Sequence, residues 1–183
     1  MLETLQAYLS ALPPAFKEIG EQRKRTLEQI SGFVSGRING QETADLIFIC
    51  THNSRRSHMG QLWAQVAAHH YRVPLVRTWS GGTEATAFNP NAVQAMQDAG
   101  LRIDVEEPGN NPLYRVRYAE DAPAMKVYSK VYDHPGNPDK DFCAVMTCSE
   151  ADENCPYIPG AEKRISLPYE DPKEFDGTTQ QKE

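Results

Sequence analysis

The chain has 183 residues, 39% of them hydrophobic and 24% charged, as expected of one globular domain with a sizeable core. Nineteen Lys and Arg against 25 Asp and Glu give a formal net charge of -6, which argues against nucleic-acid partners. No apolar run reaches the roughly 20 residues that a membrane span requires, and no signal segment starts the chain, so we expect a cytoplasmic protein without membrane partners.

Residues 1–40 form a predicted N-terminal helical extension. Four leucines recur at helical spacing before Pro13 ends the first stripe, and a second apolar stripe runs from Phe16 to Val34. We expect two short helices that pack on the rest of the chain as an extra layer. A dimerisation or partner surface is the alternative.

Residues 41–183 form the predicted catalytic domain. Apolar runs at 46–49, 74–79, 142–147 and 163–167 predict strands, with helices starting near Ser57 and at Asn89-Pro90. Two segments, 112–118 and 125–132, alternate apolar and polar residues and predict an inserted β-hairpin. Because strands alternate with helices, the fold class is α/β with a doubly wound parallel sheet.

A polar loop follows the first predicted strand and runs from Cys50 to Arg56, where a helix begins. In a Cys-x5-Arg loop placed in this way, backbone N–H groups and the helix N-terminus can surround a tetrahedral oxyanion. The Arg56 guanidinium can close the site with two hydrogen bonds, and the same field stabilises the Cys50 thiolate as a nucleophile. A strand-terminal cysteine that only packs is the alternative.

Two further residues of this loop have predicted roles. Ser57 can donate a hydrogen bond to the thiolate, and Asn53 tolerates the left-handed backbone that a tight loop requires. The predicted substrate-binding residues for arsenate, phosphate or sulfate are Thr51, His52, Asn53, Ser54, Arg55, Arg56 and Ser57.

Several segments resemble the low-molecular-weight protein tyrosine phosphatases and, within that superfamily, the thioredoxin-coupled arsenate reductases. They are 46–59 with the Cys50 loop, 79–84, 89–96, 147–156 with two cysteines, and 168–172. The resemblance extends over roughly 45–177 and leaves out 1–40 and most of 108–140. It implies the phosphatase-type doubly wound sheet. The chain departs from the family pattern at His52 and Arg55, where the family has Gly and Cys.

Three more cysteines follow the loop cysteine. Cys143 lies in the middle of a predicted strand, and we expect it to pack in the core. Cys148 and Cys155 form a predicted redox pair; zinc is the alternative, but no further ligands of suitable spacing lie nearby. If residues 149–154 are helical, the pair is separated by a rise of about 10 Å. A disulfide needs Cα atoms roughly 4.4–6.8 Å apart, so oxidation should unwind that helix.

Asp171 precedes Pro172 after the last predicted strand and is the predicted general acid, with Glu170 and Asp176 as the fallback candidates. As an isolated dipeptide, Asp-Pro is simply a turn. Its match to the acid loop of the phosphatase fold favours the catalytic role.

The resemblance implies an arsenate reductase in which Cys50, Arg56, Cys148, Cys155 and Asp171 are catalytic. It implies successive Cys50–Cys148 and Cys148–Cys155 disulfides, and an external thioredoxin-like reductant in place of a cofactor. Gln61 stands where these reductases have a potassium-binding Glu, so the potassium site is not carried over. The alternatives are a protein tyrosine phosphatase, which is a hydrolase with a Cys50 phosphoenzyme, and an oxyanion-binding regulatory module.

Overall fold

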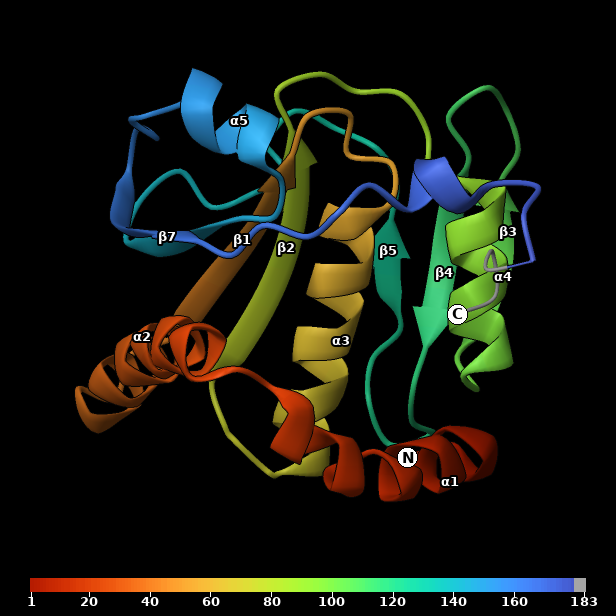
Figure 1. Ribbon diagram of the computed structural model, residues 1–183, viewed down its shortest axis with the longest axis horizontal. Coiled ribbons are helices and arrows are strands. Elements are labelled where there is room, and N and C mark those ends of the chain that lie inside the picture. Colours follow the sequence, from red (N-terminus) through yellow and green to blue (C-terminus); the bar gives the residue numbers. More distant parts are fainter. Residues whose placement is uncertain (180–183) are drawn as a thin grey trace.

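Helix α3 (Arg56–His70) lies between two sheets in the computed structural model, which describes residues 1–179 (Figure 1). Gly60 of α3 packs directly on the ring of Phe48 in the first sheet, where an added Cβ would come within 2.6 Å. Leu62 and Val66, on another side of the helix, are buried against residues of the second sheet. The helix that starts at the predicted oxyanion loop is therefore fixed on both sides by apolar packing.

The first sheet is parallel and contains the predicted central strands. Its strands are β1 (Ala44–Cys50), β2 (Val76–Gly82), β6 (Phe142–Met146) and β7 (Ala161–Ser166), in the order β2-β1-β6-β7. Ile49 of β1 is paired with Met146 of β6. The carboxyl ends of these two strands therefore lie side by side, and the segments that begin at Cys50 and at Thr147 leave the sheet together. The predicted parallel sheet is confirmed.

The second sheet is antiparallel and consists of β3 (Arg102–Glu107), β4 (Leu113–Arg117) and β5 (Met125–Val127). The predicted hairpin corresponds to β4 and β5. Strand β3 was not predicted, although the alternating apolar residues Leu101, Ile103 and Val105 carry the necessary signal. Ile103 is buried, whereas Val105, two residues later on the same face, is 56% exposed, so the strand contributes to the core only near its start.

The N-terminal helices pack on two different parts of the molecule. In α1 (Glu3–Ala11), Leu5 is fully buried and its backbone lies against Gly100, whose φ of 105° suits the turn after α4 (Pro90–Asp98). After a 3-10 turn (Pro13–Glu18), α2 (Glu21–Asn39) lays Phe33 on the parallel sheet. Both helices thus pack on the rest of the chain, although at separate places, and α2 with its 19 residues is longer than the short helix expected. No helix within residues 1–179 is long and apolar enough to cross a membrane.

Two short elements complete the region around the predicted site. Helix α5 (Ser149–Asn154) follows β6 and lies beside the end of β1, near the loop that follows β1 (Figure 1). A 3-10 turn (Pro172–Phe175) follows the segment after β7. The predicted helix between the two redox cysteines is thus present.

Candidate active site

A pocket of about 330 Å³ lies at the end of β1, over the predicted loop. It is lined by six predicted residues: Cys50, His52, Ser54, Arg55, Arg56 and Asp171. It is also lined by Thr86, Asn89 and Lys173, which we did not predict to belong to the site. Lys173 could have been suspected, because it lies two residues after the predicted acid Asp171.

Cys50 ends β1 with its side chain almost fully buried at the bottom of this pocket. Its Sγ lies 3.1 Å from Oγ of Ser57, in the first turn of α3. Asn53 Nδ2 donates to the same Ser57 oxygen at 2.8 Å. Because the Ser57 oxygen already accepts this bond, its own proton is free to point at the sulfur. The Ser57 hydroxyl is thus placed to donate a hydrogen bond to Cys50 Sγ, beside the first turn of α3.

Asn53 holds the loop in shape and does not face the pocket. Its φ is 43°, so the predicted left-handed conformation is confirmed. Its Oδ1 accepts the backbone N–H of Lys130 at 2.8 Å, and the side chain is fully buried. Gly82 lies against the loop so closely that a Cβ would come within 2.7 Å of both the Asn53 nitrogen and the Thr51 carbonyl oxygen.

The carbonyl groups of the loop are turned outward, toward residues 83–89 and Ser129. The Thr51 carbonyl accepts from Glu84 N–H at 2.8 Å, and the Ser54 carbonyl accepts from Asn89 N–H at 2.9 Å. Further outward bonds join the carbonyls of Cys50 and His52 to Thr83, Thr86 and Ser129. In a trans peptide the N–H that follows points opposite to the carbonyl. The N–H groups at 51, 52, 53 and 55 therefore point away from this outer segment, as in an anion nest.

Arg56 joins the loop to the predicted acid. One guanidinium nitrogen donates to the Tyr169 carbonyl at 3.1 Å and the other to Asp171 Oδ2 at 3.1 Å. Asp171 Oδ1 accepts the Lys173 N–H at 3.1 Å and so caps the 3-10 turn. Both Arg56 and Asp171 line the pocket, with the carboxylate about two-fifths exposed at its entrance.

The fallback acids lie elsewhere. Asp176 binds Arg55 at 3.0 Å and Asn91 at 2.9 Å, and the hydrogen bond from Arg55 lowers the pKa of Asp176. That carboxyl is therefore a poor proton donor, and the pair turns the Arg55 guanidinium toward Asp176. Glu170 is exposed and does not line the pocket. The geometry favours Asp171.

Cys148 is buried beside the loop, at the N-terminus of α5. Its Sγ accepts the Ala151 N–H at 3.4 Å and lies 3.4 Å from Oγ1 of Thr51. The Thr51 hydroxyl also donates to Glu150 Oε2 at 2.9 Å. Cys155 caps the other end of α5 and is partly exposed. All four cysteines are free thiols.

Cys50 and Cys148 are buried in one apolar cluster, on the face of the sheet formed by Ile47, Ile49 and Met146, and Cys155 packs against it. Cys143 belongs to the opposite face, with Phe33 and Phe48, because side chains alternate along β6. Burial raises the pKa of the Cys143 thiol to about 12, which makes it a poor nucleophile. Its predicted role in the core is confirmed.

No family model matches the chain. It is 30% identical over 129 residues to arsenate reductase 2 of Staphylococcus epidermidis, a match that covers 69% of this chain and 77% of that protein. The chain belongs to the arsenate reductase family. It is also 29% identical over 141 residues to the arsenate reductase of Bacillus subtilis, covering 77% of this chain and 83% of the relative. A solved thioredoxin-dependent arsenate reductase of Corynebacterium glutamicum aligns at 19% identity with a TM-score of 0.39, covering 82% and 59% of the two chains.

No cluster of three or more His, Cys, Asp or Glu side chains suited to a metal occurs within residues 1–179. Gln61 is buried, and its Nε2 donates to the Thr78 carbonyl at 3.1 Å.

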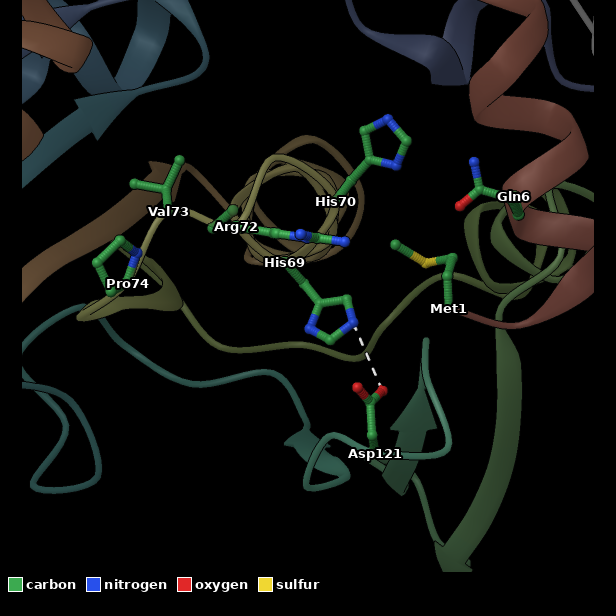
Figure 2. A pocket seen from close by; sticks show the side chains of 9 residues that line it. Met1, Gln6, His69, His70, Arg72, Val73, Pro74 and Asp121 are labelled. Carbon is green, nitrogen blue, oxygen red and sulfur yellow. Dashed lines mark ion pairs between the residues drawn. The ribbon is translucent and has the colours of Figure 1, made fainter.

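Another pocket lies at the other end of α3, away from the loop. It is lined by Met1, Gln6, Ala68, His69, His70, Arg72, Val73, Pro74 and Asp121. Figure 2 shows His69 pointing toward Asp121, at 3.6 Å between Nε2 and Oδ1. It holds no cysteine and none of the predicted site residues. This pocket is therefore separate from the pocket over Cys50.

Proposed function

We propose that this protein reduces arsenate to arsenite in the cytoplasm, using the thiols of Cys50, Cys148 and Cys155. The placement of the cysteines carries the proposal. Three of them share one face of the sheet, beginning in a pocket built for an oxyanion, and the fourth is separated on the opposite face. The membership of the arsenate reductase family supports the same substrate.

Arsenate would bind in the pocket with its oxygens toward the inward N–H groups of the loop. The Arg56 guanidinium would exchange its contact with Asp171 for two hydrogen bonds to the oxyanion. This exchange would release the Asp171 carboxyl at the entrance, on the side from which an oxygen departs. Lys173 adds a positive charge to the lining.

In the first step, the Cys50 thiolate would attack arsenic. One hydroxyl group of arsenate leaves as water after Asp171 donates its proton to it. The Ser57 hydroxyl, 3.1 Å from Cys50 Sγ, is placed to hydrogen-bond to the attacking sulfur until the sulfur–arsenic bond forms.

In the second step, Cys148 would attack the sulfur of Cys50. The sulfur–arsenic bond breaks and its electron pair goes to arsenic, which leaves as arsenite with As(III). A Cys50–Cys148 disulfide forms, so the two electrons come from the two thiols. Cys148 is suited to this step because it is buried beside the loop, in the same cluster as Cys50.

In the third step, Cys155 would attack Cys148 and release the Cys50 thiolate. The resulting Cys148–Cys155 disulfide is reduced by an external dithiol of the thioredoxin type. Because α5 separates these cysteines when it is folded, its last turn must open before the bond can form.

A phosphomonoesterase would need Cys50, Arg56 and Asp171 but neither Cys148 nor Cys155, so a paired assay separates the two reactions. We expect wild-type protein to release arsenite with a thioredoxin system over many turnovers. Cys148→Ser should abolish arsenite release, with any slow aryl-phosphate hydrolysis retained. Equal arsenite release by wild type and Cys148→Ser would overturn the proposal.

A further inference from the structure

Arg164 of β7 holds the C-terminal end of α5. Its Nε donates to the Cys155 carbonyl at 3.0 Å, and one terminal nitrogen donates to the Asp152 carbonyl at 2.5 Å. The same nitrogen forms an ion pair with the Asp152 carboxylate at 2.6 Å. Ser166, two residues later on the strand, donates to the other carboxylate oxygen at 2.6 Å. Two side chains of β7 therefore bind the C-terminal end of α5.

These contacts suit a short helix that needs help to stay folded. With six residues, α5 is below the length at which a helix is stable alone, and its last carbonyls have no partner within the helix. Arg164 supplies hydrogen bonds to two of them, and its positive charge is favourable at a helix C-terminus. The Arg164 contacts thus stabilise the folded form of α5.

The folded form is incompatible with the Cys148–Cys155 disulfide. The two cysteines flank the whole helix, and a disulfide requires their Cα atoms to come within roughly 4.4–6.8 Å. Cys155 cannot move there while its carbonyl stays bonded to Arg164 and its N–H stays bonded to the Ala151 carbonyl at 3.0 Å. The hydrogen bond from Arg164 to the Cys155 carbonyl is therefore made in the dithiol form, when Cys148 and Cys155 are both reduced and α5 is folded.

We propose that Arg164 is a positioning residue that sets the reduction potential of the Cys148–Cys155 pair by stabilising its dithiol form. The inference rests on the proposed function, in which this pair exists. The exchange is balanced: Cys155 attacks Cys148, the Cys50–Cys148 bond breaks, and Cys50 leaves as a thiolate. An external dithiol then supplies two electrons, after which α5 refolds onto Arg164. The contacts oppose closure of the disulfide and favour its reduction.

The adjacent residue offers a matched control. Lys163 donates to the Gln29 carbonyl in α2 at 3.3 Å, on the other face of the strand from Arg164. Both side chains are cationic and both bind a main-chain oxygen of a helix, but only Arg164 reaches α5. Arg164→Met and Lys163→Met therefore both remove a cationic side chain of β7, but only Arg164→Met removes contacts with α5. Arg164→Lys keeps the charge without the planar fork, and Ser166→Ala removes the second support of Asp152.

The test is the midpoint potential of the Cys148–Cys155 disulfide in dithiothreitol redox buffers, read by thiol alkylation and peptide mapping on full-length protein without arsenate. For Arg164→Met we expect an equilibrium about tenfold further toward the disulfide, equal to a potential about 30 mV more negative. Arg164→Lys and Ser166→Ala should shift it in the same direction by less, and Lys163→Met should not shift it. Hydrogen exchange of the amides at 152–155 should be faster in reduced Arg164→Met than in reduced wild type.

Two failures are distinguishable. If wild-type protein forms no Cys148–Cys155 disulfide in these buffers, the proposed relay is wrong. If the disulfide forms but Arg164→Met has the wild-type midpoint potential, the role of Arg164 is wrong while the relay stands. Where Arg164→Met does not fold, wild-type midpoint potentials for both Arg164→Lys and Ser166→Ala lead to the same conclusion. A less negative potential for Arg164→Met would also overturn this inference.

Discussion

The Ser57 hydroxyl oxygen lies 3.1 Å from the Cys50 sulfur, and Asn53 directs the hydroxyl by donating to its oxygen at 2.8 Å. A hydrogen bond to a charged acceptor contributes about 1.5–3 kcal/mol. The predicted nucleophile and its hydrogen-bond partner are thus positioned by Asn53, a buried loop residue that does not line the pocket over Cys50.

For Ser57→Ala we expect alkylation of Cys50 by iodoacetamide at pH 7 to slow about tenfold, since the thiolate loses its donor. The measurement is the rate of adduct formation, with the labelled site identified by mass spectrometry. Ser80→Ala is the matched control, because Ser80 is equally buried but binds His58 Nδ1 at 3.1 Å. Equal rates in Ser57→Ala and Ser80→Ala would contradict the assigned role.

Arg56→Lys should lower kcat/KM for arsenate by about 100-fold, because Lys cannot reproduce two parallel bonds to an oxyanion. Steady-state kinetics with a thioredoxin system measures the change. Arg55→Lys serves as control, since Arg55 also lines the pocket but is bound to Asp176. Arg55→Lys should lower kcat/KM severalfold at most. Similar decreases in kcat/KM for both variants would argue against the special position of Arg56.

Arg23 of α2 connects the N-terminal extension to the acid loop, residues 168–172, which contains the predicted acid Asp171. Its guanidinium lies 4.1 Å from the centre of the Tyr169 ring and donates to the Pro168 carbonyl at 2.9 Å. Because Asp171 follows two residues later, we expect Arg23→Met to lower kcat about tenfold, by loosening the acid loop. Arg25→Met, exposed on the same helix, should leave kcat unchanged.

A double-mutant cycle with Asp171→Asn tests the route by which Arg23 acts. If Arg23 works through the acid, its removal should have little further effect once Asp171 is gone. Fully additive losses in kcat would show that Arg23 affects the reaction by another path.

His58 should make the protein less stable in mild acid. Complete burial lowers the pKa of His58 to about 3, from an ordinary value of 6.5. Between pH 6.5 and 3 the unfolded chain therefore binds a proton that the folded chain does not, so stability falls as the pH falls through this range. At pH 5 the loss from this group is about 2 kcal/mol relative to pH 7.

Urea unfolding at pH 7 and pH 5 measures that difference. His58→Gln should lose less stability between the two pH values than wild type. His70→Gln, in the same helix but only partly buried, should show the wild-type change. The same pH dependence in all three proteins would rule out the assignment to His58.

The parallel sheet and the Cys50 loop could be predicted because both follow from local pattern. A buried strand, a Cys-x5-Arg loop and a helix start are adjacent in the sequence, and Asn53 proved to have the backbone conformation that its residue type suits. The separation of Cys143 from the other cysteines also followed from its place inside a strand.

The rest depended on tertiary contacts between distant segments. Arg23 lies 145 residues before Pro168, and Arg164 reaches Asp152 and Cys155 across the connection between α5 and β7. Nothing in the sequence next to either arginine distinguishes it from a surface arginine. Strand β3 was not predicted although its alternation was visible, because its antiparallel pairing with β4 cannot be read from its own residues. Thr86 and Asn89 line the pocket because their segment crosses over the loop.

Trapping the first disulfide tests the proposed relay most directly. Cys155→Ser, mixed with arsenate in the absence of any reductant, should release one arsenite per protein molecule and stop. Peptide mapping should then find a Cys50–Cys148 disulfide, and wild type under the same conditions should show Cys148–Cys155 with Cys50 free. Release of arsenite without a Cys50–Cys148 bond in the variant, or no arsenite from either protein, would contradict the relay.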